Sequence, residues 1–340
     1  MMKQLLFTFC ILVGVAVTVH AQSAPSITKT GTTAAQFLKI SVGARSIGMG
    51  GAFTGVSDDI AAIYWNPAGL AQMTTGQAEF NHVNWIADVK YDVAAASIIV
   101  DGIGTLAASF ATLNDGEMEV TTTSEPEGTG EKFTAGATMM GVSYARALTD
   151  RFSIGFNFKY LSEYIWNESS SGFAVDFGTM FNAPVLNGLK IGASMSNFGP
   201  KMQLDGRDVL LLVRSGAGDQ NLVNAQYSLD SYELPLLFRV GVATDAMKDE
   251  SSRLTLAVDA VHPNDNTEYV NSGIEYSWSE MVSVRAGWKS AFERGGEQGL
   301  TLGGGLNYTL QGSLGVVFDY AYQDFGRLQS VQYFSVGVKF

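Results

Sequence analysis

Apolar residues alternate with small or polar residues through most of the chain after residue 76. In residues 152–160, Phe, Ile and Tyr occupy the even positions, whereas Ser, Gly, Asn and Lys occupy the odd positions. This period of two is typical of a β-strand that presents one apolar face. The pattern recurs in residues 254–260, 282–289, 300–308 and 314–321. We therefore predict an all-β fold.

Segments of this kind can be placed along the whole of residues 77–340. They begin near Gln77, Tyr91, Gly102, Thr134, Arg151, Gly172, Gly188, Leu234, Arg253, Tyr269, Met281, Gly299, Leu314 and Val331. Single-chain bacterial outer-membrane barrels have an even number of antiparallel strands. We therefore predict a transmembrane antiparallel β-barrel of about 14 strands.

The second face of these segments distinguishes a membrane barrel from a soluble β-sandwich. It carries Gly, Ser and Ala with isolated charges such as Arg239, Asp259, Arg285 and Asp319. A sandwich would instead expose many Lys and Glu residues on its outer face. The apolar face has aromatic residues near strand ends, which resemble the interfacial girdles of membrane barrels: Trp85, Tyr160, Trp166, Tyr276, Trp278, Trp288, Tyr308, Tyr320 and Tyr322. A soluble periplasmic sandwich remains the alternative, which release from membranes by salt or carbonate would support.

The first 21 residues have the pattern of a secretory signal peptide. Lys3 precedes a short apolar run, and small residues occupy the positions before a cleavage site after Ala21. Cys10, the only cysteine, lies in this leader. We therefore expect a mature chain without a disulfide or a cysteine ligand. An uncleaved anchor is the alternative.

The last segment, "VQYFSVGVKF", also alternates. Its apolar face consists of Phe334, Val336, Val338 and Phe340. A terminal strand that ends in Phe resembles the recognition signal of bacterial outer-membrane barrels, so we expect the barrel-assembly machinery to bind it. Together with the leader, this strand predicts the outer membrane of a Gram-negative cell, with membrane lipid around the barrel.

Charge and histidine content argue against two classes of function. The formal net charge is −12, whereas nucleic-acid binding requires clustered Lys and Arg, so we expect no nucleic-acid partner. His82 and His262 lack a neighbouring nucleophile and orienting carboxylate. The polar stretch after His262 lacks the spacing and the Gly of a calcium loop. We expect no catalytic residue, no metal site and no cofactor.

The connections between segments predict the orientation of the barrel. Short turns, such as 148–151 and 183–188, should face the periplasm, and the long connections 114–132 and 199–230 should face outward. The second long connection contains the apolar patch Val209, Leu210, Leu211, Leu212 and Val213. An exposed apolar patch requires a partner or a place to fold back. We favour folding into the barrel mouth, with contact to a substrate or partner as the alternative.

Residues 22–76 differ from the rest because they contain the compact stretch "GARSIGMGGAFTGVSDDIAAIYWNPAGLAQM". A 14-stranded barrel is too wide for its own side chains to fill, since about eight strands already give a packed interior. We predict that this stretch is a small helical hatch in the lumen. Its Gly48, Gly50 and Gly51 permit close approach and positive φ.

Two short helices with a sharp corner between them are expected within the hatch. Ser57 or Asp58 can cap a helix over 60–64, which must end before Pro67. Asn66 can then cap a second helix that has Pro67 at its first position.

The motifs "ARSIGMGGAF" and "SDDIAAIYWNPAGLA" resemble the N-terminal hatch of the FadL family of outer-membrane transporters, and in particular its PorV/PorQ branch. The resemblance implies a 14-stranded barrel plugged by the hatch. It implies that the hatch corner consists of Asn66, Pro67, Ala68 and Gly69. It also implies polar anchoring of the hatch by Arg45 with Asp58 or Asp59.

For the PorV type, the resemblance implies a role in type IX protein secretion. The barrel would receive exported proteins by their C-terminal domains, with other secretion subunits as partners, and pass them to surface-attachment machinery. The alternative that the FadL resemblance implies is transport of hydrophobic small molecules.

Overall fold

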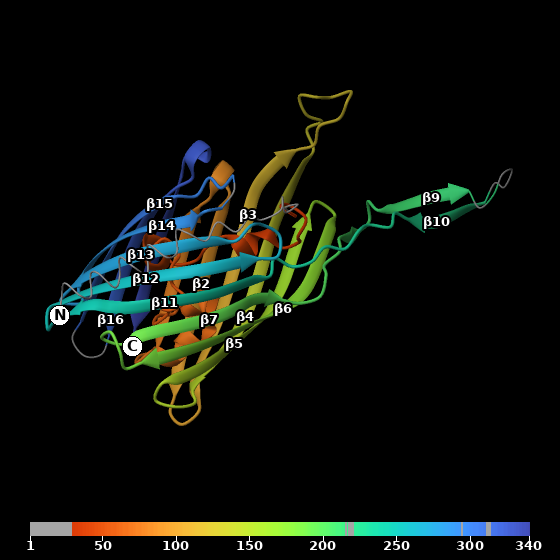
Figure 1. The fold of residues 1–340 in the computed structure, drawn as a ribbon. Helices are drawn as coiled ribbons and strands as arrows, with labels where there is room; N and C mark the ends of the chain where they lie inside the picture. Colours follow the sequence, from red (N-terminus) through yellow and green to blue (C-terminus); the bar gives the residue numbers. More distant parts are fainter. Residues whose placement is uncertain (1–28, 215, 217–220, 294, 311–313) are drawn as a thin grey trace, which may run out of the picture.

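The computed structural model describes residues 29–214, 216, 221–293, 295–310 and 314–340. The predicted leader, residues 1–21, lies outside this range, and so does its cleavage site. In the described residues, one antiparallel sheet of 15 strands includes the two-residue strand β8 (Asp205–Gly206), and its other fourteen strands form a closed barrel (Figure 1). The predicted all-β barrel of about 14 strands is confirmed.

Each barrel strand pairs with its neighbours in sequence, β7 pairs with β11, and β1 pairs with β17 to close the barrel. The barrel strands are β1 (Gln77–Asn84), β2 (Lys90–Val100), β3 (Gly104–Glu119), β4 (Lys132–Ala147), β5 (Phe152–Ile165), β6 (Glu168–Ala183), β7 (Leu189–Phe198), β11 (Leu237–Lys248), β12 (Ser252–Pro263), β13 (Tyr269–Trp278), β14 (Val282–Ala291), β15 (Leu300–Thr309), β16 (Gly315–Asp324) and β17 (Ser330–Lys339). The start of β6 lies before the predicted Gly172, because polar residues from Glu168 onward pair with β5 without an apolar alternation.

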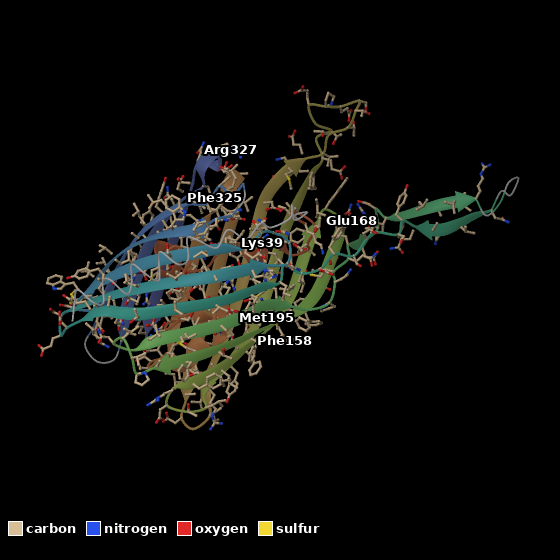
Figure 2. All side chains as sticks on the ribbon, viewed as in Figure 1. Lys39, Phe158, Glu168, Met195, Phe325 and Arg327 are labelled. Atoms are coloured by element: carbon tan, nitrogen blue, oxygen red, sulfur yellow. The ribbon has the colours of Figure 1, made fainter. Side chains whose placement is uncertain are left out.

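The two faces of the wall differ as the alternation predicts. On β17, Val336 is 49% exposed, whereas the neighbouring Ser335 is 2% exposed. Phe158 of β5 lies on the outside of the wall (Figure 2), where its ring stacks on Phe173 at a centroid distance of 5.5 Å. Apolar side chains exposed around the outer wall are those that hydrocarbon covers in a membrane barrel.

The longest connections all lie at one end of the barrel. The turns 101–103, 148–151, 184–188, 249–251 and 279–281 lie at the end where β17 finishes. The opposite end carries the connection 199–236 with β9 (Leu210–Arg214) and β10 (Leu222–Gln226), and the hairpin of β3 and β4. Short turns face the periplasm in barrels of this class, so the long connections are extracellular. The connection predicted over residues 114–132 covers only residues 120–131, because β3 continues to Glu119 and β4 begins at Lys132.

The N-terminal segment, defined here as residues 34–76, contains four short helices instead of the predicted two. They are η1 (Gln36–Lys39), α2 (Ala44–Gly48), α3 (Ala62–Trp65) and η2 (Pro67–Gln72). Two further one-turn helices, η3 (Ile86–Asp88) and η4 (Gly326–Leu328), lie in extracellular turns. No helix in the described part of the chain is both long enough and apolar enough to span a bilayer.

Candidate functional site in the barrel lumen

Inward-facing side chains from several sides of the barrel hold the N-terminal segment. Asp259 Oδ2 on β12 accepts hydrogen bonds from the amides of Phe53 (3.0 Å) and Thr54 (2.8 Å). On β17, Ser335 Oγ accepts a bond from the Ala44 amide at 2.8 Å. On β7, Ser194 Oγ donates to the Trp65 carbonyl at 2.8 Å. Because β7, β12 and β17 lie at different places around the wall, the segment lies in the lumen.

The three glycines of the Gly-Met-Gly-Gly stretch leave little or no room for a side chain. Gly50 has a φ of 69°, and a Cβ there would lie 2.5 Å from the Ser272 carbonyl oxygen of β13. Gly51 also has a positive φ, of 73°. At Gly48 the reason is proximity instead, since a Cβ would lie 3.1 Å from Gly303 Cα.

The Asn-Pro corner fits against the wall. Asn66 accepts a bond from the Ala68 amide at 3.2 Å, and its Nδ2 donates to the carbonyls of Thr54 (2.9 Å) and Thr179 (3.0 Å). Pro67 begins η2, as the sequence predicts. A Cβ at Gly69 would lie 2.1 Å from the Ser57 carbonyl oxygen, so only glycine fits there.

The predicted cap of the first helix is wrong. Helix α3 begins after Ala61, and no side chain caps it. Ser57 Oγ instead donates to the Phe53 carbonyl at 2.6 Å. Asp59 Oδ1 accepts from the Ala61 amide at 3.0 Å, which satisfies a donor before the helix begins.

Arg45 of α2 is the centre of an ion-pair cluster between the segment and the wall. Its Nη1 lies 2.6 Å from Asp58 Oδ1 and 2.8 Å from Asp59 Oδ2. Its Nε and Nη2 donate to the two oxygens of Glu275 on β13, at 2.9 and 3.0 Å. A forked pair of this kind restricts orientation as well as distance.

Other wall residues extend the cluster. Arg285 of β14 lies 2.6 Å from Glu275 and also binds Asp319 of β16. Lys190 Nζ of β7 lies 3.5 Å from Asp58 Oδ2, and an amino group of Arg253 lies 3.7 Å from Glu275. All of these residues except Lys190 line a polar cavity of about 200 Å³ near the periplasmic end, called the lower cavity below.

The two aspartates of the segment have different pKa values. Burial would raise the pKa of Asp58, but the positive charges of Arg45 and Lys190 hold that pKa well below its usual range. Burial raises the pKa of Asp59, and the neighbouring charge of Asp58 adds to this shift although Arg45 opposes it. Asp58 is therefore the stronger acid of the two and keeps its negative charge beside Arg45 to a lower pH than Asp59 does.

A second cavity of about 590 Å³, called the upper cavity below, lies near the extracellular ends of the strands. Its wall contains aromatic rings and three cations. These residues are Phe37, Tyr64, Trp65, Trp85, Tyr269, Lys39, Arg239 and Lys289. The N-terminal segment contributes to the walls of both cavities and separates them.

The prediction that Trp85 belongs to the lipid-facing aromatic girdle is wrong. It follows β1 in a turn, where the period of two no longer assigns a face. Its ring lines the upper cavity and packs edge-on against Phe325, with centroids 5.2 Å apart.

Several luminal residues are absent from the sequence-based site. The partners of Arg45 on the wall, Glu275 and Arg285, and the cavity residues Arg239 and Lys289 were not assigned a role. The available signal was a charge at an inward-facing strand position, as in the isolated charges Arg285 and Arg239. Such a charge indicates a buried partner but does not identify it.

The predicted apolar patch lies in the hairpin of β9 and β10, which projects well beyond the end of the barrel (Figure 1). Folding of residues 210–213 into the barrel mouth is therefore wrong. Leu210 and Leu212 are 58% and 62% exposed, on the same face as Leu222. Val223, on the opposite face, is also exposed, whereas Val209 is buried.

Comparisons with known proteins agree with this architecture. The family model described as type IX secretion system protein PorV matches residues 23–210, which is more than half of the 340-residue chain. The chain belongs to the PorV family. The match includes the N-terminal segment, the first seven barrel strands and the beginning of β9.

Solved structures show that this PorV-family barrel has the fold of FadL-like channels. The CymD monoaromatic hydrocarbon channel has a TM-score of 0.58 at 13% identity, over 88% of this chain and 97% of CymD. The toluene transporter TodX of Pseudomonas putida has a TM-score of 0.54 at 12% identity, over 88% of this chain and 97% of TodX. A FadL homologue of Pseudomonas aeruginosa has a TM-score of 0.50 at 12% identity, over 86% and 97%. Among curated protein sequences, none matches this chain significantly.

These findings place the protein among outer-membrane barrels. In the described residues, no group of three or more His, Cys, Asp and Glu side chains is arranged to hold a metal ion.

Proposed function

We propose that this outer-membrane barrel is a component of type IX secretion that binds exported proteins or partner subunits at its extracellular end. Two observations support the proposal. The first is membership of the PorV family. The second is the projecting hairpin of β9 and β10, which carries apolar side chains on both faces. The hairpin is the observation that supports the extracellular end as the proposed place of the interaction.

The hairpin has the physical properties of a docking element. An isolated two-stranded hairpin is only marginally stable in water. In the described residues, β9 and β10 pair only with each other, so each strand has a free backbone edge. A strand of a partner can pair with such an edge and cover the apolar side chains beside it. Leu210, Leu212 and Leu222 are the proposed contact residues.

The test replaces residues 208–227 with a flexible Gly-Ser linker. We expect the barrel to assemble, but surface-attached cargo and co-purified partner proteins to be lost. The matched control replaces residues 120–131 of the other extracellular hairpin, which is acidic. Normal attachment of all cargo by the linker variant would refute the docking role, and normal processing of all cargo after gene deletion would refute the export role.

Within this function, the N-terminal segment is proposed to close the lumen. Arg45 with Asp58 and Asp59 would anchor it, and residues 66–69 would fix its corner against the wall. The glycines at 48, 50 and 51 would allow close contact with the wall. Opening of the barrel would then require movement of this segment.

The C-terminal strand is proposed to be the assembly signal. On β17, Phe334, Val336 and Val338 share the outward face, and Phe340 follows the strand and still donates its amide to the Gly76 carbonyl at 2.9 Å. Deletion of Phe340 is expected to lower the amount of assembled barrel, measured by heat-modifiable gel mobility. Replacement of the inward-facing Lys339 by Gln is the matched control and should assemble normally.

Transport of hydrophobic small molecules is the second candidate. The upper cavity favours it, because a largely apolar concave site of about 590 Å³ has the size of a small-molecule pocket. CymD and TodX are described as channels for such compounds. A gene-deletion strain that takes up toluene as fast as the complemented strain would refute this candidate, whereas loss of cargo attachment alone would favour export.

A further inference from the structure

The described part of the chain begins at the extracellular mouth of the barrel, beside the long connection 199–236. Thr33 pairs with Glu233 of this connection in a parallel β-bridge, and the Ala34 amide donates to the Glu233 carbonyl at 2.9 Å. Residues 33–39, called the strap below, then enter the lumen and contribute to the wall of the upper cavity.

The part of the connection that the strap contacts is the root of the projecting hairpin. Met202 and Tyr232, on the two sides of this root, exchange backbone hydrogen bonds of 2.9 and 2.8 Å. Met202 and Leu234 are each 2% exposed and belong to the same buried apolar cluster as Phe37 and Leu38 of the strap. The hairpin root therefore shares both a backbone bond and an apolar core with the strap.

Two further contacts hold the strap to the barrel wall. Glu163 Oε2 of β5 accepts a hydrogen bond from the Ala35 amide at 3.0 Å. Lys39 Nζ lies 2.8 Å from Asp265 Oδ2, in the turn between β12 and β13. The position of the strap across the mouth is therefore fixed from two sides of the barrel.

The inner end of the strap continues directly into the N-terminal segment in the lumen. Tyr64 Oη of α3 donates to the Leu38 carbonyl at 3.2 Å. Two residues after the strap, Ser41 Oγ accepts a bond from Lys289 Nζ of β14 at 2.6 Å. A contiguous network of packed and hydrogen-bonded groups can carry energetic coupling between distant sites. We propose that the strap couples the root of the hairpin to the closure of the upper cavity, so that a displacement at either place changes the other.

This inference rests on the proposed docking role of the hairpin and adds a regulatory consequence to it. A partner that prefers one arrangement of the hairpin root would shift the strap, and with it access to the lumen, in proportion to that preference. Coupling of this kind is reciprocal, so it can be measured from either end. It is also a property of the free barrel. The measurements below therefore need no exported protein, and failure of the docking role would leave them unchanged.

The first experiment releases the strap and measures the hairpin. Spin labels on Arg214→Cys of β9 and Arg327→Cys of η4 report the distance between hairpin and barrel by pulsed electron paramagnetic resonance. The release variant combines Lys39→Met and Glu163→Ala, which removes the two wall contacts described above. We expect the width of the distance distribution to increase at least twofold, because the hairpin root loses a fixed neighbour.

The matched control for this experiment carries the same changes of charge away from the strap. Lys132→Met with Glu117→Ala removes an exposed ion pair of the hairpin of β3 and β4. We expect the native width in this control. The labels are specific because the only natural cysteine, Cys10, lies in the predicted leader.

The second experiment disturbs the hairpin root and measures the lumen. Ser290→Cys of β14 lines the upper cavity, where Ser290 is 6% exposed, and its rate of reaction with a charged methanethiosulfonate added to intact cells reports access from outside. Leu234→Ala removes apolar contact at the root, and Leu234 is not part of the described cavity wall. We expect at least a fivefold faster reaction. Leu212→Ala, in the exposed part of the hairpin, is the matched control and should react at the native rate.

Both experiments must succeed for the coupling to stand. A native distance width in the release variant would overturn it, and so would a native reaction rate in Leu234→Ala with native heat-modifiable mobility. Equal effects in a variant and its control would also overturn it, because the strap would then have no special part. If the release variant fails to assemble, Lys39→Met alone replaces it, and Leu234→Val replaces Leu234→Ala in the same way.

Discussion

The buried cations of the two luminal cavities differ in their partners. In the lower cavity, Arg45 and Arg285 share Glu275, and each also binds an aspartate. In the upper cavity, Arg239 and Lys289 have only neutral hydrogen-bond partners among the described residues. In the first arrangement both arginines have carboxylate partners within 3.0 Å. In the second, Glu293 and Asp115 line the cavity but form no ion pair with either cation in the described structure. A cluster of close ion pairs suits a mechanical connection.

The difference also concerns which parts of the chain are connected. The lower cluster joins α2 of the N-terminal segment to β13, β14 and β16. Movement of the segment would therefore separate several largely buried charges, which is costly. At the upper cavity the segment is connected to the wall region by the single ion pair of Lys39 with Asp265 among the described residues, and by the hydrogen bond of Lys289 to Ser41. Substitutions in the two cavities should therefore have different consequences.

The largest effect is expected for Arg45→Met. It leaves Asp58, Asp59 and Glu275 with fewer cations, and loss of one partner from a buried pair costs about 3–5 kcal/mol. We expect the free energy of unfolding to fall by about 3 kcal/mol, the lower end of this range, because Arg285 still binds Glu275. Urea unfolding in lipid vesicles measures it.

The same variant should also loosen the closure of the barrel. If the cluster holds the N-terminal segment, current through planar bilayers should rise in Arg45→Met and less so in Arg45→Lys. An unchanged urea midpoint together with an unchanged current would contradict the anchoring role.

Gly50→Ala tests whether close packing of the N-terminal segment against the wall stabilises the barrel as much as the ion pairs of Arg45 do. The substitution introduces a Cβ at a φ of 69° and 2.5 Å from the Ser272 carbonyl oxygen. We expect a loss of about 2 kcal/mol, since overpacking and an incompatible φ each destabilise. Gly31→Ala is the control, because Gly31 has a φ of 79° but no atom near its Cβ position. Equal losses in the two variants would mean that the backbone conformation alone is responsible.

Lys289→Met should affect stability much less than Arg45→Met. It removes a hydrogen bond to Ser41, worth about 1 kcal/mol, but it also removes the cost of a buried charge without a partner. No carboxylate within ion-pair distance is left behind in the described structure. We expect the free energy of unfolding to change by less than about 1 kcal/mol. A loss as large as that of Arg45→Met would show that the two cavities do not differ in this respect.

The barrel could be predicted because every strand must present apolar side chains to the hydrocarbon core of the membrane. Outward positions such as Val336 must be apolar, so the alternation marks each strand and its face. The start of β6 was displaced because Ser169–Ser171 follow no such rule and are placed by pairing with β5 and, at Ser169, with β8. Trp85 was misassigned for the same reason, because a turn has no period.

The luminal site could be predicted only in part. The Gly-rich and Asn-Pro motifs are local, so the positive φ of Gly50 and the cap by Asn66 follow from neighbouring residues. The partner of Arg45 on the wall is Glu275, which lies 230 residues away in sequence. Such a pair depends on the register of strands around the barrel, which single-sequence periodicity does not give. The unpaired state of Lys289 is likewise visible only in three dimensions.

The smallest effect is expected for Lys190→Gln, which tests the edge of the lower cluster. Lys190 Nζ is 3.5 Å from Asp58, and its side chain is 30% exposed. Partly solvated pairs contribute about 0–1 kcal/mol, so we expect the free energy of unfolding to fall by less than about 0.5 kcal/mol, without a rise in bilayer current. Arg45 retains its bonds to Asp58 and Glu275 in this variant, so the segment should stay in place. A loss comparable to that of Arg45→Met would mean that the wall holds the segment through Lys190 and Asp58, and that the fork between Arg45 and Glu275 is secondary.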